Sequence, residues 1–337
     1  MKKAIAFLSL IFILFSCNEK QADFTIAFGS CNNQNLDNPF WNQILDEKPG
    51  VWIWGGDIIY SDTEDMSVLE ANYAVLKNNP NYQNFEQNIP VMMGTWDDHD
   101  FGMNDGGEHY PEKWTSQQLF LDFFDVPLNS KRRAQKGIYI LEDFNSPKGS
   151  VRVFSLDTRY FRTDLKADPS GEKRYLPDSN PESTMLGKAQ WAWLEKNLSE
   201  SEADFNIINS SIQVLSGEHG FESWANFPLE VQRLEALIQY SKAKNVIILS
   251  GDRHISEFSE KQVPGLAYPL IDFTSSGMTH YYEGFSGENN PYRIGEVVAD
   301  KTYGILKFNF DSGQVDFIIK GTQDKVLERI SRHYPMN

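Results

Sequence analysis

Six residues along the chain are of types that bind metal ions, and each lies just after a short apolar run. Their side chains offer thiolate, carboxylate, phenolate and imidazole ligands. In chain order they are Cys31, Asp57, Tyr60, Asp98, Asp252 and His254. Each has a structural explanation when taken singly, because a Gly-Asp pair often forms a turn and a lone cysteine is often a buried apolar side chain. Their shared position at the ends of apolar runs favours a metal site.

The apolar runs read as strands that would position these residues. Uniformly apolar strands indicate sheets covered on both faces, as in α/β proteins, and polar residues at their carboxyl ends build sites. We expect one domain with strands at 24–28, 51–54, 89–93, 151–156, 205–209, 246–250 and 270–274, and a hairpin over 304–321. Predicted helices cover 38–47, 66–85, 115–124 and 186–198, and 166–184 reads as a polar excursion loop.

Composition and charge narrow the class of partner. Aromatic residues make up 13% of the 337 residues, which is ample for a large core. The net charge of −16 argues against a nucleic-acid partner, because a phosphate backbone rewards clustered Lys and Arg. An acidic protein can still bind a small phosphate ester when metal ions supply the positive charge.

The first residues predict export. A basic start and an apolar run to Phe15 precede Ser16-Cys17, which is the layout of a signal peptide. We expect a lipoprotein signal over 1–16 cleaved before a lipidated Cys17, a tether over 17–23 and a domain over 24–337. An ordinary signal peptide and a short uncleaved anchor are the alternatives. The lipoprotein would contact a bacterial membrane through its lipid alone, on the periplasmic or cell-surface side, leaving Cys31 without a disulfide partner.

Four motifs together resemble the PhoD-like (alkaline phosphatase D) branch of the calcineurin-like binuclear metallophosphoesterases. They are Phe28-Gly-Ser-Cys31, Gly56-Asp57-Ile-Ile-Tyr60, Trp96-Asp97-Asp98-His99-Asp100 and Gly251-Asp252-Arg253-His254. The resemblance extends to Leu156-Asp-Thr-Arg159 and to Phe273-Thr-Ser-Ser-Gly-Met-Thr-His280, and so covers most of the chain in order.

The resemblance implies a fold and a metal centre. The fold would be two stacked mixed β-sheets flanked by helices, in four layers α/β/β/α. Asp57 would bridge two metals. Cys31, Tyr60 and His254 would complete a ferric iron site, and Asp98 and Asp252 would hold calcium, with other divalent metals as alternatives. Gln213 stands where the wider superfamily has a histidine.

The activity implied is hydrolysis of phosphomonoesters, phosphodiesters or both, by two-metal activation of water or an oxo nucleophile. His99 would act as a general acid or as a hydrogen-bond partner of the ligand shell. Arg159 would fork onto phosphate or form a salt bridge to Asp157 or a neighbour, and His280 is a weaker substrate contact. The alternative function is a non-catalytic, metal-containing surface lipoprotein that binds a phosphorylated ligand; the full ligand set favours the enzyme.

Overall fold

The computed structural model describes residues 22–336. The predicted signal peptide 1–16, Cys17 and the first part of the tether lie outside these residues. Among the residues described, none of the helices combines the length and apolar character that crossing a membrane requires.

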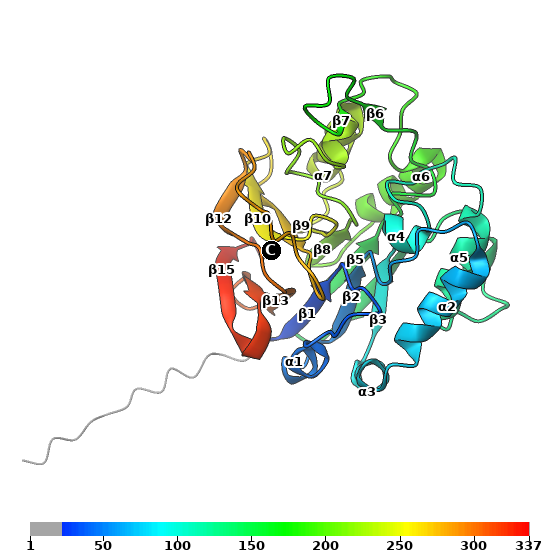
Figure 1. Ribbon diagram of the computed structural model, residues 1–337. Coiled ribbons are helices and arrows are strands. Elements are labelled where there is room, and N and C mark those ends of the chain that lie inside the picture. Colours follow the sequence, from blue (N-terminus) through cyan, green and yellow to red (C-terminus); the bar gives the residue numbers. More distant parts are fainter. Residues whose placement is uncertain (1–21, 337) are drawn as a thin grey trace, which may run out of the picture.

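Two mixed β-sheets stack on one another within residues 22–336 (Figure 1). The first has the order β15-β14-β13-β1-β2-β3, with β1 (Phe24–Gly29), β2 (Val51–Gly55), β3 (Met92–Thr95), β13 (Tyr303–Asn309), β14 (Gln314–Lys320) and β15 (Val326–His333). The second has the order β12-β10-β11-β9-β8-β5-β4, with β4 (Ile140–Asn145), β5 (Ser150–Ser155), β8 (Phe205–Asn209), β9 (Val246–Ser250), β10 (Ser256–Lys261), β11 (Leu270–Ser275) and β12 (Arg293–Val298). A small hairpin, β6 (Lys166–Ala167) and β7 (Tyr175–Leu176), stands apart.

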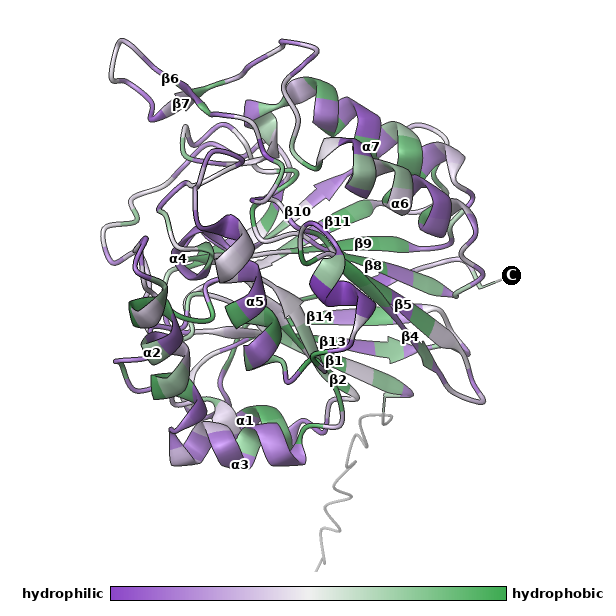
Figure 2. Cartoon of the chain, turned by 90° about the vertical axis from the view of Figure 1, so that its right-hand side faces the viewer, coloured by the Kyte–Doolittle hydropathy of each residue, from purple (hydrophilic) through white to green (hydrophobic). Residues whose placement is uncertain are grey.

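Helices cover the outer faces of the stacked sheets. Figure 2 shows α6 and α7 over the second sheet and α1 and α3 beyond the first, which gives the layers α/β/β/α. The helices are α1 (Trp41–Asp46), α2 (Met66–Lys77), α3 (Pro80–Asn88), α4 (Asp98–Phe101), α5 (Lys113–Phe123), α6 (Gly187–Ser199) and α7 (Pro228–Tyr240). The predicted α/β fold of two mixed sheets flanked by helices is therefore confirmed.

Strand β2 shows why the strands are uniformly apolar. Its five residues are all buried, and successive side chains point to opposite faces. Val51 and Ile53 join the core between the sheets, whereas Trp52 and Trp54 join the core under the helices. A strand with a core on each side has no face left for polar residues.

The predicted helix over 66–85 is two helices. Asn79 caps the second one, because its side chain accepts hydrogen bonds from the backbone N–H groups of Asn81 and Tyr82. Pro80 occupies the first turn, where its missing N–H costs nothing. The first helix, α2, therefore ends at Lys77, and α3 begins at Pro80 in a new direction.

The carboxyl ends of the parallel strands meet where the sheets face each other. In the first sheet β1, β2 and β3 run parallel, and in the second β5, β8, β9 and β11 do. A side-chain N–H of Asn209, at the end of β8, donates to the carbonyl oxygen of Trp54 in β2 at 3.0 Å. Loops from both sheets thus reach a common region.

Candidate metal centre

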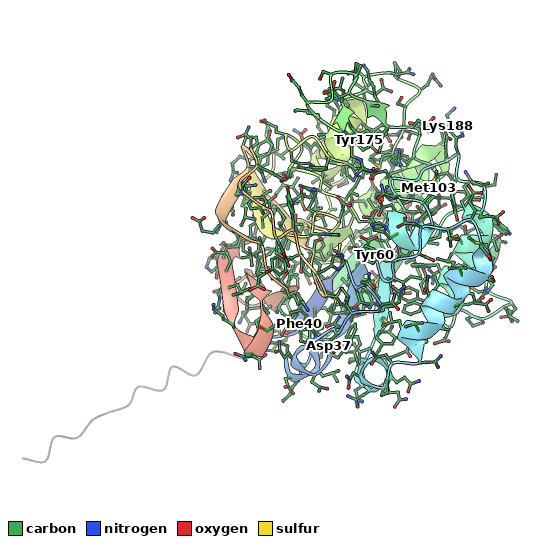
Figure 3. The ribbon with its side chains drawn as sticks, in the orientation of Figure 1. Asp37, Phe40, Tyr60, Met103, Tyr175 and Lys188 are labelled. Carbon is green, nitrogen blue, oxygen red and sulfur yellow. The ribbon has the colours of Figure 1, made fainter. Side chains whose placement is uncertain are left out.

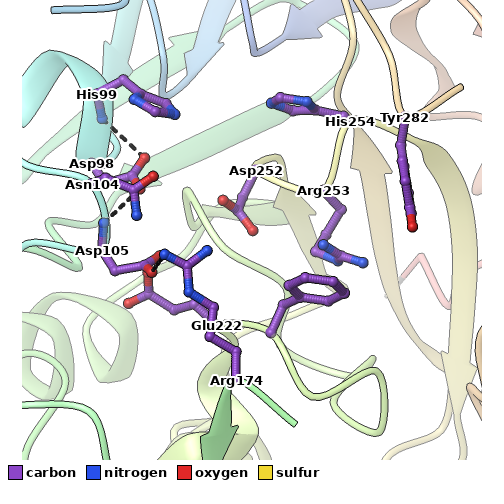
Figure 4. A pocket seen from close by; sticks show the side chains of 11 residues that line it. Asp98, His99, Asn104, Asp105, Arg174, Glu222, Asp252, Arg253, His254 and Tyr282 are labelled. Atoms are coloured by element: carbon purple, nitrogen blue, oxygen red, sulfur yellow. Dashed lines mark hydrogen bonds and ion pairs between the residues drawn. The ribbon is translucent and has the colours of Figure 1, made fainter. Parts of the chain in front are cut away.

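The six predicted ligands come together at this shared end of the two sheets. Cys31 follows β1, Asp57 and Tyr60 follow β2, and Asp98 begins α4 just after β3. The second sheet contributes the other two, Asp252 and His254, from the loop after β9. Figure 3 labels Tyr60 near the middle of the molecule, and Figure 4 shows Asp98 and His99 across a pocket from Asp252 and His254.

One end of the site, which we call the sulfur end, comprises Cys31, Asp57, Tyr60 and His254. The thiol of Cys31 donates to Asp57 Oδ2 at 3.3 Å, and the hydroxyl of Tyr60 donates to the same oxygen at 3.2 Å. The Tyr60 hydroxyl also lies 3.0 Å from Nε2 of His254. Ligand atoms of Cys31, Asp57 and His254 all lie within 4.8 Å of one another.

The other end, which we call the carboxylate end, comprises Asp97, Asp98 and Asp252. Their carboxylate oxygens also lie within 4.8 Å of one another. The backbone N–H groups of His99 and Asp105 donate to the two oxygens of Asp98, at 2.9 and 2.7 Å, and fix its orientation. Asp57, Asp98 and His99 form a further set within the same limit, so Asp57 belongs to both ends.

The buried atoms of this site fit a pair of cations. Oδ1 of Asp57 is buried without a hydrogen-bond partner among the described residues, a costly state for a carboxylate oxygen unless a cation contacts it. The backbone is left-handed at four of the ligands, with φ of 59° at Cys31, 49° at Asp57, 68° at Asp252 and 53° at His254. Left-handed conformations are uncommon outside glycine and cluster at functional sites.

Protonation at the sulfur end follows from burial. Burial raises the pKa of the Cys31 thiol to about 12 and raises the pKa values of Asp57 and Tyr60 well above their ordinary ranges. Burial therefore favours the protonated form of each of these groups when no cation is present. Metal ligation requires the deprotonated forms, so binding a cation here releases protons.

His99 lies between the two ends and carries a proton. Its ring centroid is 4.2 Å from that of Tyr60, and its Nδ1 lies 2.6 Å from Oδ2 of Asp62. Burial alone would lower the pKa of His99, but the hydrogen bond with Asp62 and the carboxylates of Asp57 and Asp98 raise it to about 10. A protonated imidazole at this place can donate a proton.

Arg159 is fully buried, and its guanidinium forms ion pairs with two carboxylates. It donates to Asp97 Oδ1 at 2.7 Å and to Glu222 Oε2 at 2.5 Å. Asp157 accepts a hydrogen bond from the backbone N–H of Arg159, at 3.0 Å, and its other donors are the indole of Trp96 and the backbone N–H groups of Ile138 and Tyr160. The structure thus shows the ion-pair alternative, with Asp97 and Glu222 as partners in place of Asp157.

His280 and Gln213 have different surroundings. The ring of His280 lies 4.5 Å from that of His254, and burial together with His254 and His99 lowers the pKa of His280 to about 4. His280 is therefore a neutral neighbour of the sulfur end. Gln213 donates to Glu257 and Thr274, each at 2.8 Å, and so belongs to a buried polar network.

A pocket of about 340 Å³ opens over the site (Figure 4). Four of the predicted residues line it: Asp98, His99, Asp252 and His254. Sequence reasoning missed others, among them Asp105, Arg174, Phe221, Glu222 and Tyr282. Arg174 lies in the polar loop 166–184, and Phe221 and Glu222 lie in the segment before α7; neither segment carried a strand pattern that would have marked these three residues.

Comparison with known proteins gives a family and one curated relative. The model of a family described as PhoD-like phosphatase matches residues 26–280. Alkaline phosphatase D of Bacillus subtilis (strain 168) is 25% identical over an alignment of 280 residues, and the match covers 75% of this chain and 47% of that protein. The chain thus spans about half the length of this curated relative.

Two solved structures share the fold. A structure of PhoD has a TM-score of 0.71 at 20% identity, covering 92% of this chain and 68% of that chain. A dimetal phosphatase from Danio rerio has a TM-score of 0.56 at 10% identity, covering 94% of this chain and 100% of that chain.

Proposed function

Because the chain belongs to the PhoD-like phosphatase family, we propose that it is a phosphoric ester hydrolase that works with two metal ions. One observation carries this proposal. Ligand atoms from both sheets converge on Asp57, whose Oδ1 is buried without a partner among the described residues. A carboxylate in this state is suited to bridging two cations.

The donor types support a different cation at each end. Cys31, Tyr60 and His254, with Asp57, would hold ferric iron, because thiolate, phenolate and carboxylate suit a small trivalent cation. Asp98 and Asp252, again with Asp57, would hold calcium or another divalent cation that prefers oxygen. When bound, two such cations supply positive charge to the phosphoryl oxygens and lower the pKa of water.

The residues around the metals have their own tasks. Asp62 orients His99, and the hydrogen bond between them favours the protonated imidazole, which would supply a proton to the leaving-group oxygen. Arg159 acts as a positioning residue, because its ion pairs with Asp97 and Glu222 hold two loops of the site together. Its guanidinium is buried beneath the site, so we assign it no contact with the substrate.

Turnover of model substrates tests the proposal. Purified, metal-loaded protein should hydrolyse p-nitrophenyl phosphate, bis(p-nitrophenyl) phosphate or both, and the ratio reports the preference for monoesters or diesters. Asp98→Ala is the control, since hydrolysis that survives in this variant comes from a contaminant. Tight binding of phosphate esters without hydrolysis of either substrate would support the non-catalytic surface protein instead.

Export as a lipoprotein is a separate part of the proposal. It rests on the apolar run that ends at Ser16-Cys17. Cys17→Ala should leave the signal unprocessed or release the protein from the membrane fraction. A processed Cys17→Ala protein that still sediments with membranes would contradict lipidation at this residue.

A further inference from the structure

One arginine of the pocket comes from the excursion loop. Arg174 directly precedes β7, and its backbone N–H, like that of Tyr175, donates to the carbonyl oxygen of Gly220 at 3.0 Å. Figure 4 shows its side chain entering the pocket beside Asp105 and Glu222. The loop 166–184 is thus pinned so that this side chain reaches the site.

The other arginines around the pocket already form ion pairs with carboxylates. Arg159 and Arg162 are at most 1% exposed and pair with buried carboxylates. Arg253 is 7% exposed, and its Nη2 donates to both oxygens of Glu288, at 2.7 and 2.8 Å. None of these three guanidinium groups can turn toward a ligand without breaking a buried ion pair.

Arg174 differs in exposure and in the strength of its attachment. Its side chain is 48% exposed, and the ion pair that it forms is with a single carboxylate, that of Asp105. The side chain of Asp105 is 12% exposed, so the pair is half-buried, and exchanging its anion costs less than breaking the buried pairs of the other three arginines. The planar fork of an arginine matches two phosphoryl oxygens as well as it matches a carboxylate.

Asp105 keeps a partner if the guanidinium leaves. The hydroxyl of Tyr175 donates to Asp105 Oδ2 at 2.6 Å, and the backbone N–H of Asp105 still orients Asp98. We propose that Arg174 exchanges Asp105 for two terminal oxygens of the substrate's phosphoryl group, an inference that rests on the phosphoesterase function above. Arg174 would then offset the repulsion between an anionic ester and the carboxylates that line the pocket.

The test measures binding of inorganic phosphate by titration calorimetry. Metal-loaded wild-type protein is compared with Arg174→Ala, Arg174→Lys and the control Lys173→Ala, and metal content is measured for each. Lys173 is exposed and directs its amine to the carbonyl oxygen of Glu218, so Lys173→Ala makes the same charge change outside the pocket.

We expect Arg174→Ala to weaken phosphate binding by about 10- to 100-fold, the range for hydrogen bonds to a charged group. Arg174→Lys should restore part of the affinity, because an ammonium supplies charge without the fork. Lys173→Ala should stay within about twofold of wild type, since a rim charge contributes little. KM for p-nitrophenyl phosphate should rise in parallel.

Three results would overturn the inference. Unchanged phosphate affinity in an Arg174→Ala protein that still turns over esters would remove the role of Arg174 and leave the enzymatic function standing. Weaker binding accompanied by lost metal would show that Arg174 supports the ligand shell instead. A wild-type protein that neither binds phosphate nor hydrolyses esters would remove the proposed function and this inference together.

Discussion

The two ends of the metal centre differ in the positive groups that face their buried acids. At the sulfur end the donors hydrogen-bond mainly to one another, and burial raises the pKa values of Cys31 and Tyr60. At the carboxylate end Asp97 pairs with the buried Arg159. Burial would also raise the pKa of Asp98, but Arg159 and His99 more than offset it and lower that pKa.

The difference teaches where a cation is needed most. At the carboxylate end Arg159 and His99 compensate Asp98, whereas burial raises the pKa of Asp97 to about 8 and raises the pKa of Asp252 well above its ordinary range. The sulfur end has to release the protons of Cys31 and Tyr60, whose ordinary pKa values lie above that of a carboxyl group, so its metal affinity should keep rising to higher pH. Asp57 belongs to both ends, and the predictions below test the two ends separately.

The largest effect should come from the shared residue. Asp57→Asn removes the ligand that both ends use, so both metals should be lost. We expect turnover to fall by at least ~10³-fold, beyond the 10- to 100-fold typical of losing an outer-shell partner of a metal. Elemental analysis and ester hydrolysis measure it. Asp37→Asn, at an exposed position, is the control. Full activity with both metals retained would contradict the role of Asp57 as a ligand shared by the two ends.

A pair of variants should separate the two ends. Tyr60→Phe should lower iron content and bleach visible absorbance, because a phenolate bound to ferric iron gives a charge-transfer colour. Asp98→Ala should lose the second metal and nearly all turnover while keeping that colour. Calcium chelation of the wild type should act as Asp98→Ala does. A colourless, fully active wild type that contains zinc alone would contradict the assignment of metals.

His99 touches both ends and should matter for one class of substrate. As a general acid it would contribute ~10²–10⁴-fold when the leaving group is an alkoxide, but little when it is p-nitrophenolate. His99→Ala should therefore harm alkyl phosphate esters far more than aryl ones, with metal content nearly unchanged. His109→Ala, which changes an exposed histidine, is the control. Equal losses on both substrates together with lost metal would assign His99 to the ligand shell.

The smallest effect should come from the partner of His99. Asp62 raises the pKa of His99 through a hydrogen bond, so Asp62→Asn should lower that pKa. A general acid works only while protonated, and the alkaline limb of the pH–rate profile for an alkyl ester should therefore move to lower pH. We expect roughly a tenfold loss of rate on that limb, which corresponds to a fall of about one in the pKa of His99. Glu64→Gln, an exposed neighbour, should leave the profile in place.

The sequence predicted the strands that are rich in apolar residues and missed those that are rich in polar and charged residues. β2, β8 and β9 are mainly apolar and buried along their whole length, and their bounds agree with the prediction to within a residue. β4 and β15 are edge strands that carry charged residues and are partly exposed, so no apolar run marks them. An apolar run marks a strand that is covered by a core on each face, whereas these two edge strands have no such run and are not predicted.

The site could be predicted in part for a similar reason. Cys31, Asp57 and Asp252 each follow an apolar strand, so their convergence was expected. Glu222 and Arg174 lie in loops, and their place at the pocket depends on how those loops pack. The partners of Arg159 could not be predicted from the sequence either, because Asp97 and Glu222 are 62 and 63 residues away in the chain.

The two-sheet origin of the ligands has a consequence for the order of folding. Cys31 and Asp57 are 26 residues apart, whereas the contact between Tyr60 and His254 closes a span of 194 residues. Contacts of such separation form late, because the entropy of closing the loop has to be met first. The cation sites therefore exist only once the second sheet has docked on the first. Metal occupancy would report that folding is complete, and it would slow the first separation of the sheets during unfolding.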